Sequence, residues 1–290
     1  MKRQIYVISI GGNALSTEPS ALNSVMKAIY KLSHMGDVVI THGNGPQVGE
    51  LAKVERKPLA LLTAQTEAEI GVYLSDKISE YFHRKRKKAV VDTVITRVLV
   101  DEKDPSFKNP SKPIGSFYSA GKARDLAKKG MALKRLIGGY RIVVPSPKPV
   151  RIINIEEIAY LASMQHIVIA AGGGGIPVFR NYRLANGVID KDYATSLLAA
   201  QIRAKKMFIL TNVDGAYLDF GTSKQKRIGR ITANEMIGYV RKGFFEDGSM
   251  KPKVEACIDF VRHTKGSAVI GNMSNAENVI AMRGCTIISR

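Results

Sequence analysis

The chain has 290 residues, of which 45% are hydrophobic and 24% are charged. This apolar content is enough for a sizeable buried core, so overall disorder is excluded and one large α/β domain or two modest ones are expected. Lys and Arg number 44 against 25 Asp and Glu, which gives a formal net charge of +19. That charge favours an anionic partner, either nucleic acid, a membrane surface or a phosphorylated small molecule, and composition does not choose among the three.

The two cysteines, Cys257 and Cys285, lie in apolar stretches and are expected to be buried thiols. Glycines end the first apolar run, residues 4–10, too soon for a signal sequence or a membrane span. We therefore expect a cytoplasmic protein without a membrane segment. The basic run at 83–88 is expected to cap the end of a helix, because no zinc spacing or aromatic interleaving favours nucleic acid as its partner.

Strand and helix patterns alternate along the chain. The first half predicts strands at 4–10, 37–41 and 89–96, with helices at 21–35 and 66–83. The second half predicts strands at 166–171, 206–211 and 267–270, with helices at 191–203, 232–241 and 250–264. This order predicts an α/β fold with a mainly parallel sheet covered on both faces.

The segment 101–149 breaks the alternation and is rich in proline and lysine. A connection of this length without elements of its own is uncommon inside a compact domain. The segment is therefore predicted to be a small inserted subdomain or lid.

Three glycine-rich turns follow predicted strands, at Gly11-Gly12-Asn13, Gly43-Asn44-Gly45 and 172–175. Ligands of parallel sheets bind beyond the carboxyl ends of the strands, where glycine backbone N–H groups can approach an anion closely. The P-loop pattern does not occur, and the glycine spacing does not fit a dinucleotide fingerprint. Each turn alone is compatible with an ordinary tight turn, but together with the charge they favour a ligand with several phosphate-like groups.

Charged residues stand near the starts of two predicted helices. In Asp190-Lys191-Asp192 the lysine is flanked by two carboxylates, an arrangement suited to holding an ammonium against phosphate, although an N-cap aspartate beside a solvated lysine explains it too. Lys253 opposes the dipole of its helix, which favours an anion there. Asp214 follows the strand at 206–211 and suits either a nucleoside contact or an ordinary Asp-Gly turn. No cluster has the spacing of a protein metal site, so none is expected.

Taken together, these motifs resemble the carbamate kinases, a family within the amino acid kinase superfamily. The resemblance runs in order from residue 5 to residue 288, and the lysine and proline block around Lys112 is specific to carbamate kinases. The residues that carry it are 11–15, 42–49, 104–115, 144–149, 172–177, 190–192, 248–250 and 252–256.

The resemblance implies an open three-layer αβα sandwich with a mainly parallel sheet and a small protruding subdomain. It implies one domain, 1–290, with an acceptor half at 1–165, a lid subdomain at about 103–149 and a nucleotide half at 166–290. It also implies a homodimer. The implied reaction is ATP plus carbamate to ADP plus carbamoyl phosphate, whose reverse direction makes ATP in arginine or agmatine catabolism.

Site roles are implied in the same way. The transferring phosphoryl group is cradled by Gly11, Gly12 and Asn13, and carbamate is held by Gly43, Asn44 and Gly45. Lys112 reaches the acceptor from the subdomain, Lys191 and Lys253 bind nucleotide phosphates, and Asp192 orients these lysines. Further nucleotide contacts come from Gly172, Gly173, Gly174 and Asp214. Mg²⁺ is expected on the β and γ phosphates, held largely by ATP or ADP and water.

Two positions depart from the family pattern, Lys251 beside Lys253 and Ser116 after the Lys112 block. Two other functions stay open. One is a different small-molecule kinase on the same fold, and the other is a nucleotide-sensing or nucleic-acid-binding protein that uses the +19 charge. The presence of Lys112, Lys191, Asp192 and Lys253 favours the kinase, because a sensor does not need an acceptor lysine.

Overall fold

A mainly parallel β-sheet forms the centre of the molecule in the computed structural model, which describes residues 3–11, 19–136 and 138–290. Within these residues the sheet has eight strands, and all neighbours are parallel except β15 and β16. Their spatial order is β14 (Arg230–Thr232), β16 (Thr286–Ser289), β15 (Ser267–Asn272), β11 (Lys206–Thr211), β1 (Ile5–Ile10), β2 (Asp37–His42), β9 (Ile167–Ala170) and β3 (Val91–Val94).

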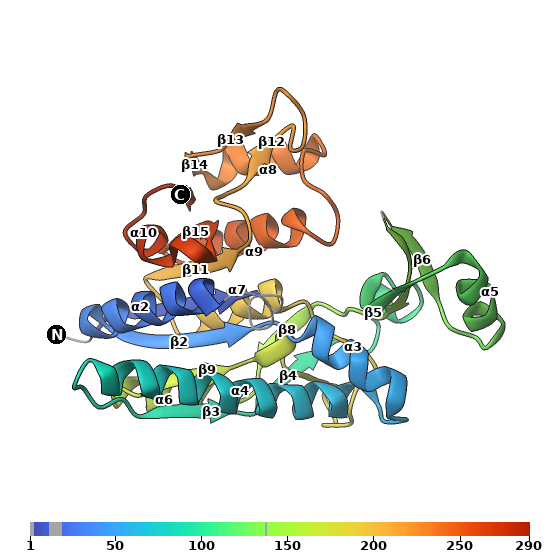
Figure 1. The fold of residues 1–290 in the computed structure, drawn as a ribbon, viewed down its shortest axis with the longest axis horizontal. Coiled ribbons are helices and arrows are strands. Elements are labelled where there is room, and N and C mark those ends of the chain that lie inside the picture. The colour runs from blue at the N-terminus through green and yellow to red at the C-terminus, as the bar shows by residue number, and fades with distance from the viewer. Residues whose placement is uncertain (1–2, 12–18, 137) are drawn as a thin grey trace.

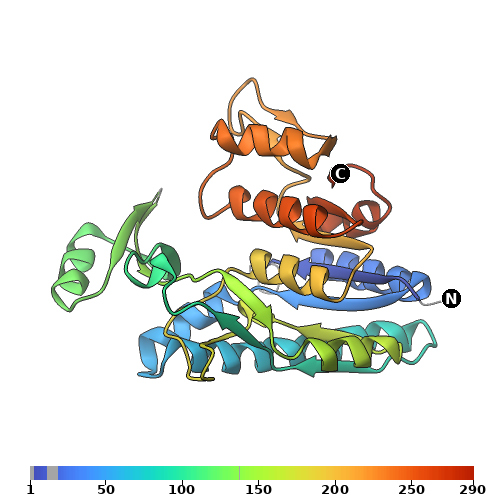
Figure 2. The ribbon, with the colours of Figure 1, turned by 180° about the vertical axis from the view of Figure 1, so that it is seen from behind.

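Helices cover both faces of this sheet (Figures 1 and 2). One face packs on α2 (Pro19–Met35), α4 (Leu59–Arg84) and α10 (Ala276–Ile280). The other packs on α6 (Ile155–Ser163), α7 (Lys191–Gln201), α8 (Ala233–Arg241) and α9 (Met250–His263). Along β11, Met207 and Ile209 face the second layer while Phe208 and Leu210 face the first. The predicted three-layer αβα sandwich is confirmed.

A subdomain protrudes to one side of the body (Figure 1). It consists of β5 (Lys112–Tyr118), α5 (Ala120–Lys128), β6 (Leu133–Leu136) and β7 (Gly139–Val144), and its antiparallel strands follow the order β5-β7-β6. The short helix η1 (Pro105–Phe107) leads into it. The predicted protruding subdomain is confirmed. The sequence did not predict its strands, because their side chains are largely exposed or half-buried and leave no clear apolar pattern.

The subdomain is held against the body through α3 (Gly45–Val54), a helix that the sequence patterns did not predict. A Cβ atom on Gly49 would lie 2.2 Å from the backbone nitrogen of Gly115. This approach requires glycine at position 49, and it fixes β5 beside the helix that follows Gly43-Asn44-Gly45.

Two predicted boundaries need correction. The strand expected at 89–96 is shorter in the structure, where β3 covers 91–94: the chain turns at Thr96, whose Oγ1 donates to the carbonyl of Val94 at 2.6 Å, and continues as β4 (Arg97–Val100) in a second sheet. The helix expected at 66–83 begins earlier, at Leu59. It ends at Arg84 within the basic run, as expected, and Cys257 and Cys285 are buried free thiols, also as expected.

The remaining elements are short. Strand β4 lies between β10 (Ile176–Val178) and β8 (Pro149–Ile152), and β12 (Tyr217–Leu218) pairs with β13 (Lys226–Arg227). The 3-10 helices η2 (Gly172–Gly174) and η3 (Met273–Asn275) follow β9 and β15.

Candidate active site

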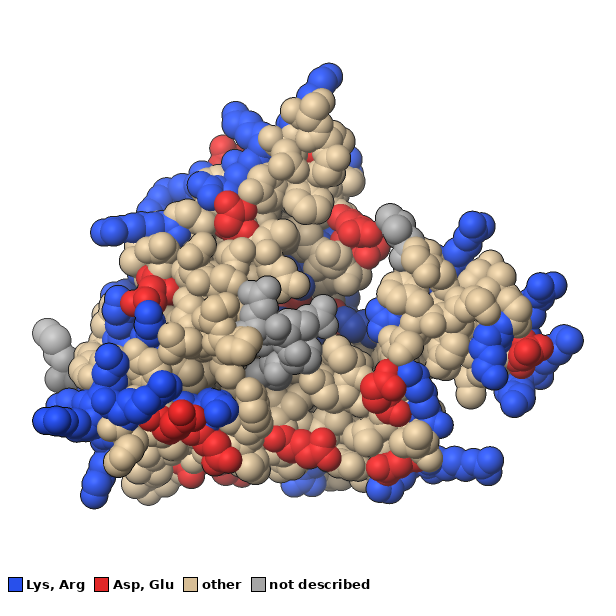
Figure 3. Space-filling view, viewed as in Figure 1, with Lys and Arg blue, Asp and Glu red and all other residues tan. Residues whose placement is uncertain are grey.

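A cavity of about 310 Å³ opens where the carboxyl ends of β1, β2 and β11 meet the start of α7, beneath the subdomain. Four cations and two carboxylates line it within the described residues, so positive charge is in excess. Figure 3 shows basic side chains at the junction of body and subdomain, while acidic and basic residues are interspersed over the rest of the visible face. The charged lining residues are Lys112, Arg141, Lys191, Lys253, Asp190 and Asp192.

The centre of the cavity is an aspartate held between two lysines. One carboxylate oxygen of Asp192 is paired with Lys191, and the other accepts from Nζ of Lys253 at 3.1 Å. Lys191 also donates to Oγ of Ser9 at 2.9 Å, and Lys253 donates to the carbonyl of Ser249 at 3.2 Å. Helices α7 and α9 and strand β1 thus place both ammonium groups in one cavity.

Burial and ion pairing act against each other at this cluster. Burial disfavours the carboxylate of Asp192, but the adjoining Lys191 and Lys253 hold its pKa well below the usual range. Burial also disfavours the ammonium of Lys253, and Asp192 overcomes this effect and raises its pKa. For Lys191, burial dominates and lowers the pKa, although Asp192 opposes the change. The carboxylate of Asp192 therefore lies between two ammonium groups, and their remaining N–H donors are available to bind a phosphate.

Asp190 connects α7 to the subdomain. Its Oδ1 accepts from the backbone N–H of Asp192 at 2.9 Å and caps the helix. Its Oδ2 is paired with Lys112, the first residue of β5. The cap that the sequence offered as an alternative reading is present, and the same carboxylate also positions the subdomain lysine.

Two turns form the side of the cavity next to β2. The amide Nδ2 of Asn44 donates to Oγ1 of Thr66 on α4 at 2.9 Å, and a Cβ atom on Gly173 would lie 2.1 Å from that same Nδ2. Gly173 has φ 64, a conformation that favours glycine. Gly11, Gly43, Gly45 and Gly173 line the cavity together with Asn44.

Gly172 and Gly174, on either side of Gly173, contact other parts of the protein and not the cavity. Gly172 and Gly174 do not line the cavity, and a Cβ atom on either would collide with His42 or with the backbone of Ile189. The backbone N–H of Gly172 donates to Glu67 at 2.9 Å, and Thr96 donates to the same carboxylate at 3.2 Å. Glu67 on α4 thus holds the turn after β9 in place.

Glu67 and His42 are both fully buried. Desolvation raises the pKa of Glu67 to about 8, because only backbone N–H groups and Thr96 stabilise its charge. Desolvation lowers the pKa of His42 to about 4, so His42 is neutral near pH 7. Glu67 was not a candidate from the sequence, because nothing in the linear pattern places α4 under the turn at 172–174. His42 lies in the segment 42–49 that carries the family resemblance, but it received no site role of its own.

Several candidate residues lie elsewhere. Asp214 is not among the cavity-lining residues; it accepts from the phenol of Tyr217 and pairs with Arg227 at 2.7 Å. Asn212, two residues earlier, does line the cavity. Gly12 and Asn13 fall outside the described residues. Both departures from the family pattern have local partners: Lys251 forms an ion pair with Asp247 at 2.8 Å, and the hydroxyl of Ser116 donates to Glu50 at 2.9 Å.

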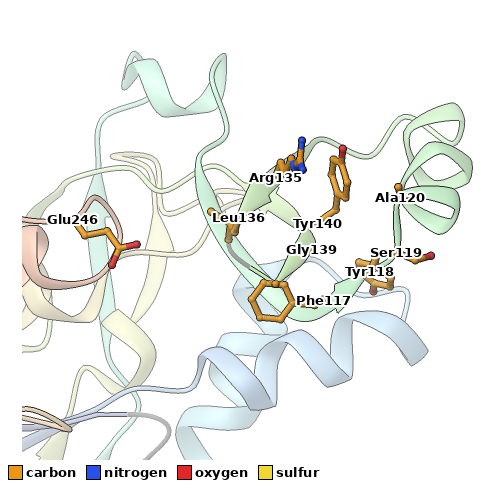
Figure 4. Close-up of a pocket in the computed structure, with 10 residues that line it drawn as sticks. Phe117, Tyr118, Ser119, Ala120, Arg135, Leu136, Gly139, Tyr140 and Glu246 are labelled. Atoms are coloured by element: carbon orange, nitrogen blue, oxygen red, sulfur yellow. The ribbon is translucent and has the colours of Figure 1, made fainter. Parts of the chain in front are cut away.

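A larger cavity of about 1080 Å³ lies between the subdomain and Glu246 of the C-terminal part (Figure 4). Arg135 is its one cationic lining residue and Glu246 its one carboxylate among the described residues, and neither pairs with the other. We place the site in the smaller cavity because the lysines and aspartates converge there. Among the described residues no group of His, Cys, Asp and Glu has the arrangement of a metal site.

Fold and cavity together define an α/β protein with a cationic pocket at the carboxyl edge of a parallel sheet. The model of the amino acid kinase family matches residues 4–272. A carbamate kinase of Thermoplasma volcanium is 38% identical, covering 97% of this chain and 98% of its own, and carbamate kinase 2 of Enterococcus faecalis is 38% identical over 99% of each chain. A structure titled carbamate kinase from Giardia lamblia bound to AMP-PNP has a TM-score of 0.86 and 34% identity, covering 99% of this chain and 98% of the other.

The chain belongs to the amino acid kinase family and, within it, to the carbamate kinases. In the described ranges no helix is long and apolar enough to cross a bilayer.

Proposed function

We propose that this protein catalyses reversible phosphoryl transfer between ATP and carbamate, giving ADP and carbamoyl phosphate. The observation that carries the proposal is the bridge of Asp192 between Lys191 and Lys253 inside a cation-rich cavity. The full-length similarity to carbamate kinases supports the choice of acceptor.

In the proposed reaction a carbamate oxygen attacks the γ-phosphorus of ATP. A bond forms between that oxygen and phosphorus, the bond from phosphorus to the bridging oxygen breaks, and its electron pair leaves with ADP. Carbamate is already an anion, so no general base has to remove a proton. The chief demand on the protein is to position the reactants and to stabilise the negative charge on the transferring group.

The cluster around Asp192 meets that demand. Lys191 and Lys253 bind the nucleotide phosphates and the charge that develops during transfer, and Asp192 fixes both ammonium groups. Lys112 reaches the acceptor or its phosphate while Asp190 holds it. The backbone of Gly11, which lines the cavity, cradles the transferring group together with Gly12 and Asn13.

The acceptor binds on the side of the cavity formed by Gly43, Asn44 and Gly45. Gly173 contacts Asn44, so we assign Gly173 to this acceptor side, and we assign Gly172 and Gly174 a supporting role through their contacts with His42, Glu67 and Ile189. Strand β9 pairs with β2 and β3, which favours an acceptor half that includes the turn after residue 170. The nucleotide then lies toward β11, where Asn212 lines the cavity and Asp214 stands near the nucleoside.

Magnesium enters this site as part of the nucleotide substrate. Both carboxylates that line the described cavity, Asp190 and Asp192, are engaged by lysines and are not free to serve as metal ligands. A hard cation bound to the β and γ phosphates and to water is compatible with such a lining.

Three further proposals concern the cell. We propose that the physiological direction makes ATP from carbamoyl phosphate, that the enzyme acts in the cytoplasm, and that it is a homodimer. Strand β3 lies at the edge of the sheet, and the elements on either side of it carry exposed apolar side chains: Val72 and Tyr73 on α4, Tyr160 on α6, and Met164 directly after α6. We expect the dimer to bury this face, and Tyr160→Glu should then shift the mass measured by light scattering toward a monomer.

A panel of acceptors tests the proposed reaction. ADP formation should require carbamate and should remain at background with N-acetylglutamate, aspartate or an isoprenyl phosphate. Turnover of one of the other acceptors without carbamate would assign a different kinase activity to this fold. A steep salt dependence of DNA binding without any kinase activity would favour the nucleic-acid alternative.

A further inference from the structure

The four cations of the active-site cavity differ in their partners. Lys112 is paired with Asp190, while Lys191 and Lys253 share Asp192. Arg141 makes no ion pair with any described residue, although it lines the same cavity. Among the described residues, Arg141 is therefore the one cation of the cavity lining that has no carboxylate partner.

The surroundings of Arg141 partly exclude water, so an unpaired charge at this position is unfavourable in free energy. Its Nε is buried and has no hydrogen-bond partner among the described residues. The aromatic ring of Phe117 lies against the guanidinium, with Cζ 5.5 Å from the ring centre. Partial burial lowers the pKa of Arg141 while its group remains a cation. A partly desolvated guanidinium is stabilised by an anion, and nothing described in the protein supplies one.

The position of Arg141 indicates which anion fits. Arg141 belongs to β7, which pairs with β5, the strand of Lys112. Close contact between Gly49 and Gly115 fixes β5 against α3, the helix that begins at Gly45. Arg141 therefore stands at the acceptor end of the cavity, whereas Lys253 and Asn212 lie toward the proposed nucleotide.

We propose that Arg141 binds the acceptor substrate through its anionic oxygens, those of the phosphate in carbamoyl phosphate or of the carboxylate in carbamate. This proposal rests on the proposed function and adds a substrate-binding residue to it. The planar guanidinium presents two parallel N–H donors, which match both groups in a bidentate manner, and a lysine at this position would offer only a point charge. The contact with Phe117 restricts the guanidinium before the ligand binds, which lowers the conformational entropy lost on binding.

Steady-state kinetics of ATP formation test this role. Arg141→Gln should raise KM for carbamoyl phosphate by about 10-fold to 100-fold, the range expected for the loss of hydrogen bonds to a charged group. The Kd of ADP, measured by calorimetry without carbamoyl phosphate, should change less than about twofold, a bound we set for a residue at the far end of the cavity. Arg141→Lys should give an intermediate KM, because lysine keeps the positive charge but lacks the two parallel N–H donors of the guanidinium.

Arg135→Gln is the matched control. Arg135 lies in the adjacent strand β6 of the same subdomain but lines the other cavity, so its removal should leave KM for carbamoyl phosphate unchanged. Circular dichroism establishes that each variant is folded. If Arg141→Gln does not fold, the comparison of Arg141→Lys with wild type carries the test.

The outcomes separate the two proposals. A wild-type protein that neither binds nor turns over carbamoyl phosphate would contradict the proposed function, whatever Arg141 does. Wild-type turnover with an unchanged KM in Arg141→Gln would overturn the role of Arg141 alone. A larger loss of ADP affinity than of carbamoyl phosphate affinity would also overturn it, because it would place the guanidinium at the nucleotide.

Discussion

Lys112 and Asp190 are paired across 78 residues of sequence, and the contact joins the protruding subdomain to the first turn of α7. One carboxylate therefore serves two elements, since its other oxygen caps the helix. The subdomain lysine is placed by the same short segment that carries Lys191 and Asp192.

The first prediction separates these two tasks. Asp190→Asn keeps a side-chain oxygen for the helix cap but removes the charge that holds Lys112. We expect kcat to fall by about 10-fold or more, because the ammonium loses a charge-assisted bond that fixes its position. KM for ADP should not rise, since the cavity becomes more positive.

A double-variant cycle identifies the route of this effect. Lys112→Ala alone should reduce turnover or the use of carbamoyl phosphate more than the binding of ADP. If Asp190 acts through Lys112, the double variant should be no slower than Lys112→Ala. Losses that multiply in the double variant would mean that Asp190 acts independently of the lysine.

The second prediction concerns Asp192, whose side chain is only 4% exposed between two lysines. Asp192→Asn should remain folded at 25 °C but lose roughly 3–5 kcal/mol of stability, because two buried ammonium groups lose their counterion. The kcat should fall by about 100-fold or more as the lysines move out of place. Urea denaturation and initial rates measure the two effects.

Asp125→Asn, at an exposed position on α5, is the control for charge removal. It should leave both stability and turnover unchanged. Complete unfolding of Asp192→Asn would assign this aspartate a mainly structural role.

The third prediction concerns the lysines themselves. Lys191→Ala and Lys253→Ala should each reduce kcat by about 100-fold to 1000-fold, the usual cost of removing one group that stabilises charge in the transition state. Lys251→Ala should keep near wild-type turnover, because Lys251 pairs with Asp247 and does not line the cavity. Normal turnover in either of the first two variants would remove that lysine from the mechanism.

The fourth prediction is a pH dependence of stability. The folded pKa of Glu67 is raised to about 8, whereas a glutamate in the unfolded chain ionises near 4.5. Between these values the folded state holds a proton that the unfolded state has lost, so stability falls as pH rises and the loss is complete above the folded pKa. The expected slope is about 1.4 kcal/mol per pH unit.

His42 has the opposite effect at lower pH. Its folded pKa of about 4 lies below its unfolded value of 6.5, so its contribution to stability increases with pH and levels off above 6.5. Urea denaturation from pH 7 to 8, where the contribution of His42 has largely levelled off, therefore tests Glu67, and Glu67→Gln should remove most of the slope. Glu69→Gln, an exposed neighbour, should retain it. The same slope in Glu67→Gln as in wild type would show that another group titrates.

The sequence predicts features that depend on local chemistry. Apolar runs such as those of β1 and β11 are buried on both faces, so their identity as central strands follows from composition alone. The turn after residue 42 and the Asp190-Lys191-Asp192 start of α7 also carry local signals, a glycine pair and a capping aspartate. Such local signals suffice to predict a ligand site at the carboxyl edge of the sheet.

Local sequence patterns do not predict contacts between residues that are far apart in the chain. Glu67 is an acidic residue inside a helical pattern, and only the fold brings it to Gly172, 105 positions away. Arg141 is one of many basic residues in a polar segment, and only the pairing of β5 with β7 places it beside Lys112. The strand expected at 89–96 ends early, at Val94, because the chain turns at Thr96, whose Oγ1 accepts from the backbone N–H of Ala171 just after β9, a contact between segments far apart in the chain.

The proposed reaction is tested most simply by the initial rate of ATP formation from carbamoyl phosphate and Mg²⁺-ADP, with acetyl phosphate as the competing donor. We expect rapid turnover that strongly prefers carbamoyl phosphate and that falls by about 100-fold or more in Lys191→Ala. No turnover of carbamoyl phosphate by a protein that still binds ADP, or turnover that does not depend on Lys191, would contradict it.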